Sequence, residues 1–536
     1  MTNETLKTSR ESLLADIDKR VEDHILEPTN AELLKKLIRQ ADDIDEAMMI
    51  AALGTTYKRT GFHFDKRLEK VVKDIRYFKK NESLSFCTDE NRPTHKLIIG
   101  DNYEALQNLL IEYKNRVSVI YIDPPYGKDS MGEFAQTNYE NAITRDNLLS
   151  MLYPRLMLAK QLLADDGVIF CSIDDKNQAY VKCLFDEVFG EYNFIANVIW
   201  ERAYAPVNLK KHFSESHDYI LCYAKDIQHA VCNGLPRTDE ANYRYSNPDN
   251  DPRGDWKSSD LSVGPAVQTN IYPITTPSGR VTLPPSGYSW RLSKEKFQEY
   301  VNDNRIWFGP NGANVPSIKR FLSEVKQGLT PMTIWKYTDV GHSQDATKDL
   351  KKIFSDTFVF PYPKPVGLMK RICSLYGNKD AIILDFFAGS GTTGHAVLDL
   401  NEKDKGNRQF ILCQLNEKTD TTPKGIAYDV TAKRLKRIMT GECYDGTKNF
   451  KWAQENLPYG DNLDVYEIAE VANDCAIEGK TPFDVIGETL YGQAKFETLR
   501  EKIAWVCSNF AHTQQYLENY EEWEKRKREL DHATRG

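Results

Sequence analysis

Apolar runs long enough to cross a membrane are absent from this sequence, and its first ten residues are polar and charged. We therefore expect neither a membrane anchor nor a secretion signal, whose core is apolar. The 10 cysteines include no CxxC pair, so no metal centre is expected. Several of them, such as Cys171, Cys222 and Cys373, lie inside apolar segments. They are typical of reduced core residues, and we expect a cytoplasmic protein without disulfides.

A surplus of positive charge is also missing. The formal net charge is −8 over 536 residues, which disfavours a uniformly basic nucleic-acid-binding protein. It does not exclude DNA as a partner, because a local basic groove is what binds phosphates. The length exceeds one typical domain, and a hydrophobic content of 40% is ample for a core. We expect a large core domain with additional regions.

A short strand and the turn after it are the first features that indicate chemistry. The β-branched and aromatic run 117–122 predicts a buried parallel strand, and Asp123-Pro124-Pro125-Tyr126 follows it directly. Two prolines force the chain out of the sheet, at the strand end where ligands bind in open α/β sheets. A rigid turn without any catalytic role remains the alternative for these residues alone.

A glycine-rich loop follows much later in the chain. The apolar strand 381–384 precedes the loop 385–394, and the strand 409–415 comes next, just before Glu417. An acidic residue at that point of a βαβ unit usually holds a ribose diol. The loop lacks the lysine of a P-loop, which excludes a P-loop ATPase. Its Gly-x-Gly-x-x-Gly spacing leaves a nicotinamide-dependent oxidoreductase open for this stretch.

Strands and helices alternate around both stretches. Further strands are predicted at 96–99, 168–173, 194–200 and 219–223, with apolar helices between several of them. This order indicates an α/β fold with a doubly wound, mostly parallel sheet. Asp101 follows the first of these strands and could either cap the next helix or bind a ligand.

Taken together, the Asp-Pro-Pro-Tyr turn, a variable middle and the later Asp-Phe-Phe-Ala-Gly-Ser-Gly-Thr-Thr-Gly loop resemble a β-class DNA adenine-N6 methyltransferase. In that class the cofactor motif follows the catalytic one, as a circular permutation of the usual order. The stretches 151–156, 189–194 and 360–365 are similar to the modification (Mod) subunits of type III restriction–modification systems. The resemblance runs from about residue 95 to residue 440.

The resemblance implies a Rossmann-like core that transfers a methyl group from S-adenosylmethionine to adenine N6 in duplex DNA. Asp123 and the carbonyl of Pro124, held in the rigid turn with Pro125, would grip the amine. Tyr126 would stack on the base once it is flipped out of the duplex. Asp before Pro-Pro-Tyr favours adenine N6, and cytosine N4 is the alternative.

The resemblance also implies a set of cofactor-binding residues. Gly389 and Gly391 would let the backbone approach the cofactor, Asp385 would anchor the loop, and Glu417 would take the ribose hydroxyls. For Asp101, the resemblance favours cofactor binding over helix capping. The full set is Asp101, Lys364, Pro365, Asp385, Phe387, Gly389, Ser390, Gly391, Thr392, Thr393 and Glu417.

The chain is expected to divide into five regions. These are a helical N-terminal region (1–85), the catalytic half of the core (86–202), a target-recognition domain (203–355), the cofactor-binding half (356–440) and a helical C-terminal region (441–536). Interleaved aromatic and basic residues in 203–355 suit DNA reading, although an ordinary α+β insert is the alternative. The DNA-contact candidates are Arg253, Trp256, Trp290, Arg291, Lys319 and Arg320.

The expected partners follow from the same resemblance. They are double-stranded DNA, a second copy of the chain in a homodimer, and a restriction (helicase/nuclease) subunit as a candidate. The alternative function is a DNA-recognition subunit that acts mainly with that restriction partner.

Overall fold

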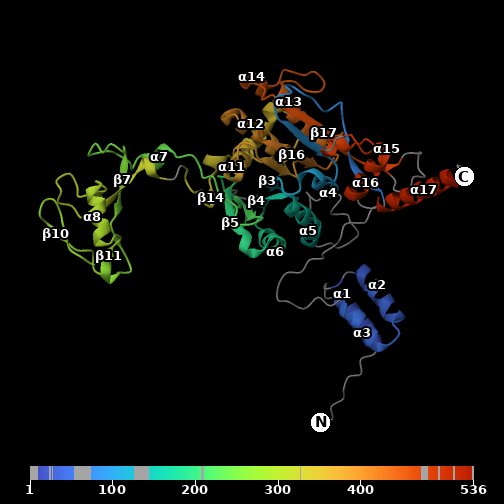
Figure 1. Cartoon of the computed structure of the whole chain (residues 1–536), viewed down its shortest axis with the longest axis horizontal. Helices are drawn as coiled ribbons and strands as arrows, with labels where there is room; N and C mark the ends of the chain where they lie inside the picture. Colours follow the sequence, from blue (N-terminus) through green and yellow to red (C-terminus); the bar gives the residue numbers. More distant parts are fainter. Residues whose placement is uncertain are drawn as a thin grey trace, which may run out of the picture. The chain divides into compact units, whose positions relative to one another are not determined.

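The computed structural model describes residues 10–22, 26, 28–53, 74–125, 144–206, 211–325, 328–355, 357–471, 481–492, 495–510 and 513–533. It divides into a small unit within residues 1–64 and a large unit within 65–536 (Figure 1). The small unit contains α1 (Arg10–Glu22), α2 (Pro28–Gln40) and α3 (Ile44–Leu53). Their apolar faces meet around Ile17 and Ile38, at the helical spacing visible in the sequence.

A ten-stranded sheet forms the centre of the large unit, with the order β1-β17-β2-β16-β15-β3-β4-β6-β5-β14. From β17 to β4 each strand is parallel to its neighbour, whereas β1 and β6 run antiparallel to theirs. The predicted α/β class with a mostly parallel sheet is confirmed. The strands are β1 (Ile75–Lys80), β2 (Thr94–Ile99), β3 (Val117–Ile122), β4 (Leu163–Ile173), β5 (Phe194–Glu201), β6 (His217–Ala224), β14 (Ile334–Trp335), β15 (Ile382–Asp385), β16 (Gln409–Gln414) and β17 (Asn462–Val471).

The two motif-bearing strands are direct neighbours in this sheet. β15 pairs with β3 in parallel, and Asp385 stands opposite Tyr121. Apolar side chains of both strands are buried at this point, which is why they occupy the middle of the sheet. Because the strands are parallel, Asp123 and the glycine-rich loop leave the sheet at the same edge.

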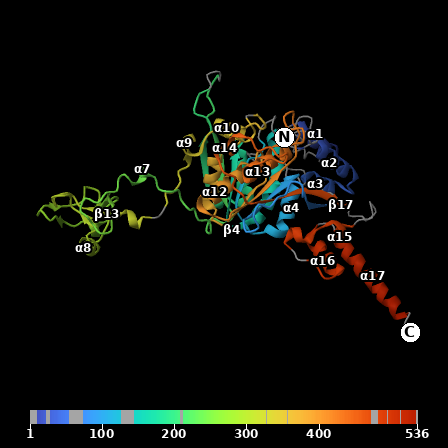
Figure 2. The same ribbon diagram turned by 90° about the horizontal axis from the view of Figure 1, so that it is seen from above.

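Helices pack against the sheet in two groups, which can be followed in Figures 1 and 2. One group contains α4 (Asn102–Tyr113), α5 (Thr144–Leu162) and α6 (Gln178–Phe189). The other contains α10 (Ser343–Ile353), α11 (Val366–Tyr376), α12 (Thr392–Asp404), α13 (Lys433–Thr440) and α14 (Lys451–Glu455). Val119 and Ile383 share one apolar cluster with residues of the second group. The arrangement is the doubly wound one that alternating strands and helices predict.

The inserted lobe is smaller than the predicted region 203–355. A backbone bridge between Leu235 and Leu329 closes its base. Within it lie α7 (Asp239–Asn242), β7 (Trp256–Asp260), β8 (Ser262–Val263), β9 (Ile274–Thr275), β10 (Val281–Thr282), β11 (Ser289–Trp290), α8 (Lys294–Asn302), β12 (Ile306–Trp307) and β13 (Ser317–Phe321). By contrast, β6, β14, α9 (Tyr337–Val340) and α10 belong to the sheet domain, because their apolar residues pack into its core.

Both terminal regions contribute a strand to the sheet, which the helical predictions for 1–85 and 441–536 did not include. β1 and β17 pair with each other in antiparallel fashion at one side of the sheet. Beyond β17 the described helices are α15 (Pro482–Val485), α16 (Leu499–Asn509) and α17 (Gln514–Ala533). Such segments become strands because they pair with partners that are distant in the sequence, and the local pattern of apolar residues does not indicate this pairing.

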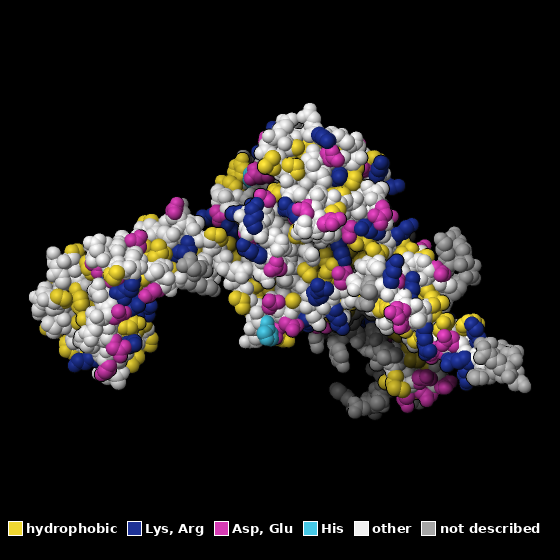
Figure 3. Space-filling view, turned by 45° about the horizontal axis from the view of Figure 1, so that its top comes forward, with side chains coloured by type: hydrophobic (Ala, Val, Ile, Leu, Met, Phe, Trp, Pro, Cys, Tyr) yellow, Lys and Arg dark blue, Asp and Glu magenta, His cyan; other side chains and the backbone are white. Residues whose placement is uncertain are grey.

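The surface carries charges of both signs. Figure 3 shows basic and acidic side chains interspersed over the face in view. None of the helices in the described part of the chain is both long and apolar enough to span a bilayer. Those same residues contain no cluster of three potential metal ligands.

Candidate active site

Asp123 stands one residue beyond the end of β3, where the chain leaves the sheet. Its Oδ2 accepts a hydrogen bond from Lys364 Nζ at 2.6 Å. Its Oδ1 is buried and has no hydrogen-bond partner among the residues that the structure describes. Pro124 is buried behind it, whereas Tyr126 lies outside the described residues. A buried carboxylate oxygen that lacks a donor is suited to accept a hydrogen bond from a ligand.

Lys364 holds the other side of this carboxylate. Its side chain is 10% exposed, and its Nζ lies 6.0 Å from the centre of the Trp200 ring. Pro365 directly follows it and precedes the first turn of α11, which fixes the backbone. The family resemblance assigns Lys364 to the cofactor, and the structure adds an ion pair with the catalytic candidate that sequence reasoning missed.

A buried carboxylate lies near this ion pair. Asp218, at the start of β6, pairs with Arg202 through Nε and Oδ1 at 3.0 Å. Burial raises the pKa of Asp218 above its usual range, while Lys364 and Arg202 act in the opposite direction. Because β6 runs antiparallel to β4, its first residues lie at the same edge as the end of β3. No motif in the sequence signals this pair.

Asp385 ties together the two ends of the glycine-rich loop. Its Oδ1 accepts from the backbone N–H of Phe387 at 3.0 Å, and its Oδ2 accepts from Thr393 Oγ1 at 2.5 Å. Burial raises the pKa of Asp385 to about 7, against these two hydrogen bonds, which lower it. The carboxylate therefore anchors the loop at an electrostatic cost.

This cost predicts a specific pH dependence of stability. Between the ordinary pKa of 3.8 and about 7, folded Asp385 keeps a proton that the unfolded chain releases, so stability falls as pH rises through this window. Asp385→Asn removes the contribution. Urea denaturation measures the free energy of unfolding. Between about pH 5 and pH 7 we expect this free energy to fall by about 2 kcal/mol more in the wild type than in Asp385→Asn. Asp380→Asn, at an exposed carboxylate just before β15, should follow the wild type, and an unchanged pH slope in Asp385→Asn would contradict the assignment.

Two glycines shape the loop by adopting left-handed backbone conformations. Gly389 has φ +51° and Gly391 has φ +78°. The N–H of Gly389 donates to Gln414 Oε1 at 2.6 Å, and a Cβ at this position would lie 3.1 Å from Phe360 Cζ. Gly391 is the N-cap of α12. A glycine turn that opens a long helix brings backbone N–H groups and the positive end of the helix dipole to a ligand.

The hydroxyls of the loop are engaged within the protein. Arg434 Nη1 donates to Ser390 Oγ at 3.0 Å and to Thr392 Oγ1 at 2.9 Å. Burial lowers the pKa of Arg434 to about 10. Ser390, Thr392 and Thr393 therefore hold the loop in shape, and any contact with a ligand would come chiefly from their backbone. Arg434 lies in what reads as an ordinary amphipathic helix, so no sequence pattern signals this role.

A π-helical turn, Ala427–Ala432, braces the loop from the same side. Thr431 Oγ1 donates to the carbonyl of Gly389 at 2.6 Å. Such turns are rare and occur often at functional sites.

Asp101 caps a helix, which was one of the two roles open to it from the sequence. Its carboxylate accepts from the N–H of Tyr103 at 2.7 Å at the start of α4, which confirms the capping alternative. Arg155 Nη2 also donates to this carboxylate, at 3.0 Å and 3.2 Å. The adjacent Asn102 donates to the carbonyl of Phe386 at 2.8 Å, which connects this turn to the glycine-rich loop. Contact of Asp101 with a cofactor stays a prediction.

Glu417 completes the row of groups at this edge. It is partly exposed just beyond β16, which lies between β2 and β15. The adjacent Asn416 presents a buried Oδ1 that has no hydrogen-bond partner within the described ranges. The ends of β2, β16, β15 and β3 thus bring a polar set together in strand order. A partly exposed carboxylate and a glycine turn at one edge of the sheet fit an adenosyl cofactor with ribose hydroxyls.

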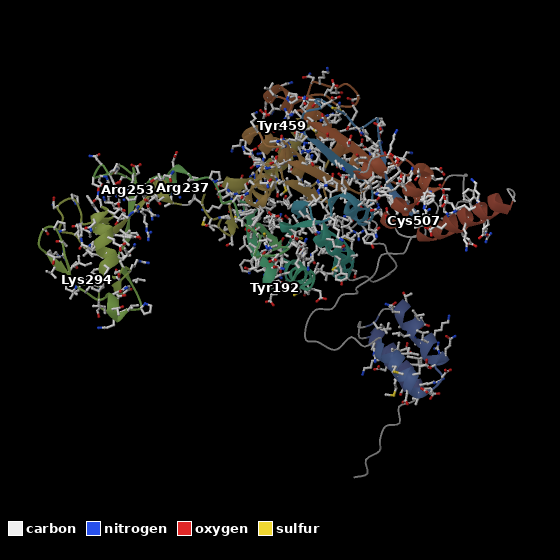
Figure 4. All side chains as sticks on the ribbon, viewed as in Figure 1. Tyr192, Arg237, Arg253, Lys294, Tyr459 and Cys507 are labelled. Carbon is white, nitrogen blue, oxygen red and sulfur yellow. The ribbon has the colours of Figure 1, made fainter. Side chains whose placement is uncertain are left out.

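The predicted DNA-contact residues of the inserted lobe differ in their exposure to solvent. Trp256, Trp290 and Lys319 are buried, and the two indoles donate to Asp249 Oδ1 and to the Tyr272 carbonyl. These three assignments are corrected, because the side chains build the core of the lobe. Arg253, labelled in Figure 4, pairs with Asp251 at 2.9 Å and lies over the Phe321 ring. Arg291 and Arg320 are exposed and remain predictions.

Comparison with known families gives two matches. The family described as DNA methylase matches residues 117–421, which include both motifs. A family described as an uncharacterised conserved protein matches residues 10–119.

Among curated relatives, the StyLTI Mod subunit, a type III restriction–modification enzyme of Salmonella typhimurium, is 31% identical over 80% of this chain and 70% of its own length. The EcoPI Mod subunit of Escherichia phage P1 is 30% identical over 65% of this chain and 63% of its own length. The type II methyltransferase M.KpnI of Klebsiella pneumoniae is 31% identical over 64% of this chain and 87% of its own length. The chain thus spans only about two thirds of the two Mod subunits.

Solved structures give more distant likenesses. A putative DNA modification methylase of Thermus thermophilus, complexed with S-adenosyl-L-methionine, has a TM-score of 0.32 and 15% identity, and covers 69% of this chain and 99% of its own. The cytosine-N4-specific PvuII DNA methyltransferase has a TM-score of 0.35 and 10% identity over 66% of this chain and 95% of its own.

Proposed function

The chain belongs to the DNA methylase family, and from that premise we propose that it transfers a methyl group from S-adenosylmethionine to adenine N6 in duplex DNA. The observation that carries the proposal is the pairing of β3 with β15, which sets Asp123 beside the glycine-rich loop at one edge of the sheet. An oxidoreductase would have no use for the Asp-Pro-Pro turn.

The chemistry of the amine defines the task of Asp123. An exocyclic amine is a poor nucleophile because its lone pair is delocalised into the purine ring. Asp123 Oδ1 and the carbonyl of Pro124 would accept its two N–H groups and favour a pyramidal nitrogen. Lys364 holds Oδ2 at 2.6 Å, so Oδ1 keeps its direction. When bound, the cofactor supplies a methyl group made electrophilic by a cationic sulfonium; the chain's residues orient the reactants.

The residues that we propose for cofactor binding lie at the same edge of the sheet. Gly389, Gly391 and the start of α12 would cradle it, Glu417 would take the ribose hydroxyls, and Asp101 would lie near the adenine. Asp385 and Arg434 act through the loop and keep its shape.

The type III relatives supply the proposed setting. We propose that this chain is the modification subunit of such a system, works as a homodimer, flips the target base, and associates with a restriction subunit. Asp rather than Ser before Pro-Pro-Tyr favours adenine, and cytosine N4 is the alternative.

Methyl transfer from labelled S-adenosylmethionine to duplex DNA tests the function. Long-read sequencing of DNA from a host that expresses the chain should reveal N6-methyladenine in one sequence motif. N4-methylcytosine would move the assignment to the alternative base. Site-specific DNA binding without any methylation would replace the proposal by a recognition subunit that acts with a restriction partner.

A further inference from the structure

An exposed aromatic group lies just beyond the end of β5. Tyr204 is 57% exposed, and its ring centre lies 5.3 Å from the ring of Tyr337 and 5.3 Å from that of His342. Tyr337 and His342 lie 5.6 Å apart, and the interplanar angles of these pairs are 30°, 26° and 23°. The three rings pack against one another, but His342 is buried at 7% exposure, so the ring surface that a ligand can reach belongs to Tyr204 and the half-buried Tyr337. Burial does not explain Tyr204, because most of its surface is open to solvent.

This aromatic group is connected to the candidate active site by short contacts. Tyr204 comes two residues after Arg202, which pairs with Asp218 at 3.0 Å. The carbonyl of Arg202 accepts from the N–H of Ser343, the residue after His342, at 3.2 Å. On the other side, Trp200 Nε1 donates to the carbonyl of Gly341, and its ring lies near Lys364 Nζ. The rings therefore flank the residues that hold Asp123.

We propose that Tyr204 and Tyr337, packed against the buried ring of His342, form a stacking surface for an unpaired nucleobase of the DNA substrate. The inference rests on the proposed function and names a binding site for it. A base that leaves the duplex loses its stacking contacts with the neighbouring bases. An aromatic side chain can replace these contacts, whichever base it is. Lys336 is exposed beside Tyr337 and offers a cation for a neighbouring phosphate.

The same strand provides a matched control. Tyr192 precedes β5 and is 77% exposed, whereas Tyr204 follows β5. The two residues therefore lie at opposite edges of the sheet, and Tyr192 can be located in Figure 4. Tyr192→Ala removes a similarly exposed ring far from the site.

The probe is a fluorescein-labelled DNA duplex with one bulged, unpaired base, compared by anisotropy with the fully paired duplex at one salt concentration. Wild type should prefer the bulged duplex. Tyr204→Ala should weaken binding of the bulged duplex about tenfold, the scale of one lost base–aromatic stack. Tyr204→Phe should keep the affinity, because it keeps the ring, and Tyr192→Ala should leave the affinity unchanged.

Equal losses in Tyr204→Ala and Tyr192→Ala, or no preference of the wild type for the bulge, would overturn the proposal. Binding of S-adenosylhomocysteine, measured by calorimetry, should be the same in every variant. The binding assay requires no methyl transfer. A wild type that binds the bulge through Tyr204 but methylates nothing would overturn the proposed function alone, and methylation with no role for Tyr204 would overturn the stacking surface alone.

Discussion

Asp123→Ala is expected to lower methyl transfer to DNA by at least about 10²–10³-fold, the usual effect of losing a group that binds the reacting atoms in the transition state. The buried Oδ1, which has no partner within the described part of the molecule, is the acceptor that the variant removes. The measurement is kcat with labelled S-adenosylmethionine and duplex DNA. Cofactor affinity should fall far less than methyl transfer, because Asp123 has no assigned contact with the cofactor and acts on it only through Lys364.

The alanine variant also leaves the Lys364 ammonium, which is 10% exposed, without its carboxylate. Removing one member of a partly buried ion pair is destabilising, so folding must be verified by circular dichroism and by binding of S-adenosylhomocysteine. Asp123→Asn keeps the shape of the side chain and should lose activity as well, because the charge opposite Lys364 is gone. Asp175→Ala, at an exposed carboxylate beyond β4 on the same edge, should stay active. Full activity of a folded Asp123→Ala would disprove the proposed catalytic turn.

The central features of the fold follow from local sequence signals. The apolar runs of β3 and β15 predict buried parallel strands, and the polar turn after each predicts the edge where ligands bind. Their adjacency cannot be read from the spacing of the motifs in the sequence, and only the pairing of β15 with β3 in the folded chain shows it. The sequence does not predict β1 and β17, because they become strands only by pairing with segments far away in the chain: β1 with β17, and β17 also with β2.

The support of the site was less predictable than the site itself. Arg434 and Thr431 reach the glycine-rich loop only after the chain has folded back on it. For Trp290 the sequence predicts a function that the fold excludes. Its place beside a basic residue indicates DNA contact, but its side chain is fully buried. Composition reports which side chains are present, and burial decides which of them a ligand can reach.

Gly391→Val is expected to weaken binding of S-adenosylmethionine at least about tenfold and to reduce activity in proportion. Gly391 has φ +78°, where a β-branched residue is strained by more than the roughly 1–2 kcal/mol typical of L-residues. A Cβ there would lie 3.3 Å from Thr431 Cγ2, so the two further methyl groups of valine must displace the turn that braces Gly389. Calorimetric titration with the cofactor measures the loss.

Gly287→Val separates backbone strain from loop geometry. Gly287 has nearly the same φ, +79°, and a Cβ there would have no atom within 4 Å. It lies in the inserted lobe, so its valine variant carries a similar backbone strain without touching the cofactor edge. Cofactor affinity should therefore fall in Gly391→Val and stay at the wild-type value in Gly287→Val. Equal affinities in both variants would show that the conformation of the loop at Gly391 does not govern cofactor binding, and the glycine turn would lose its assigned role.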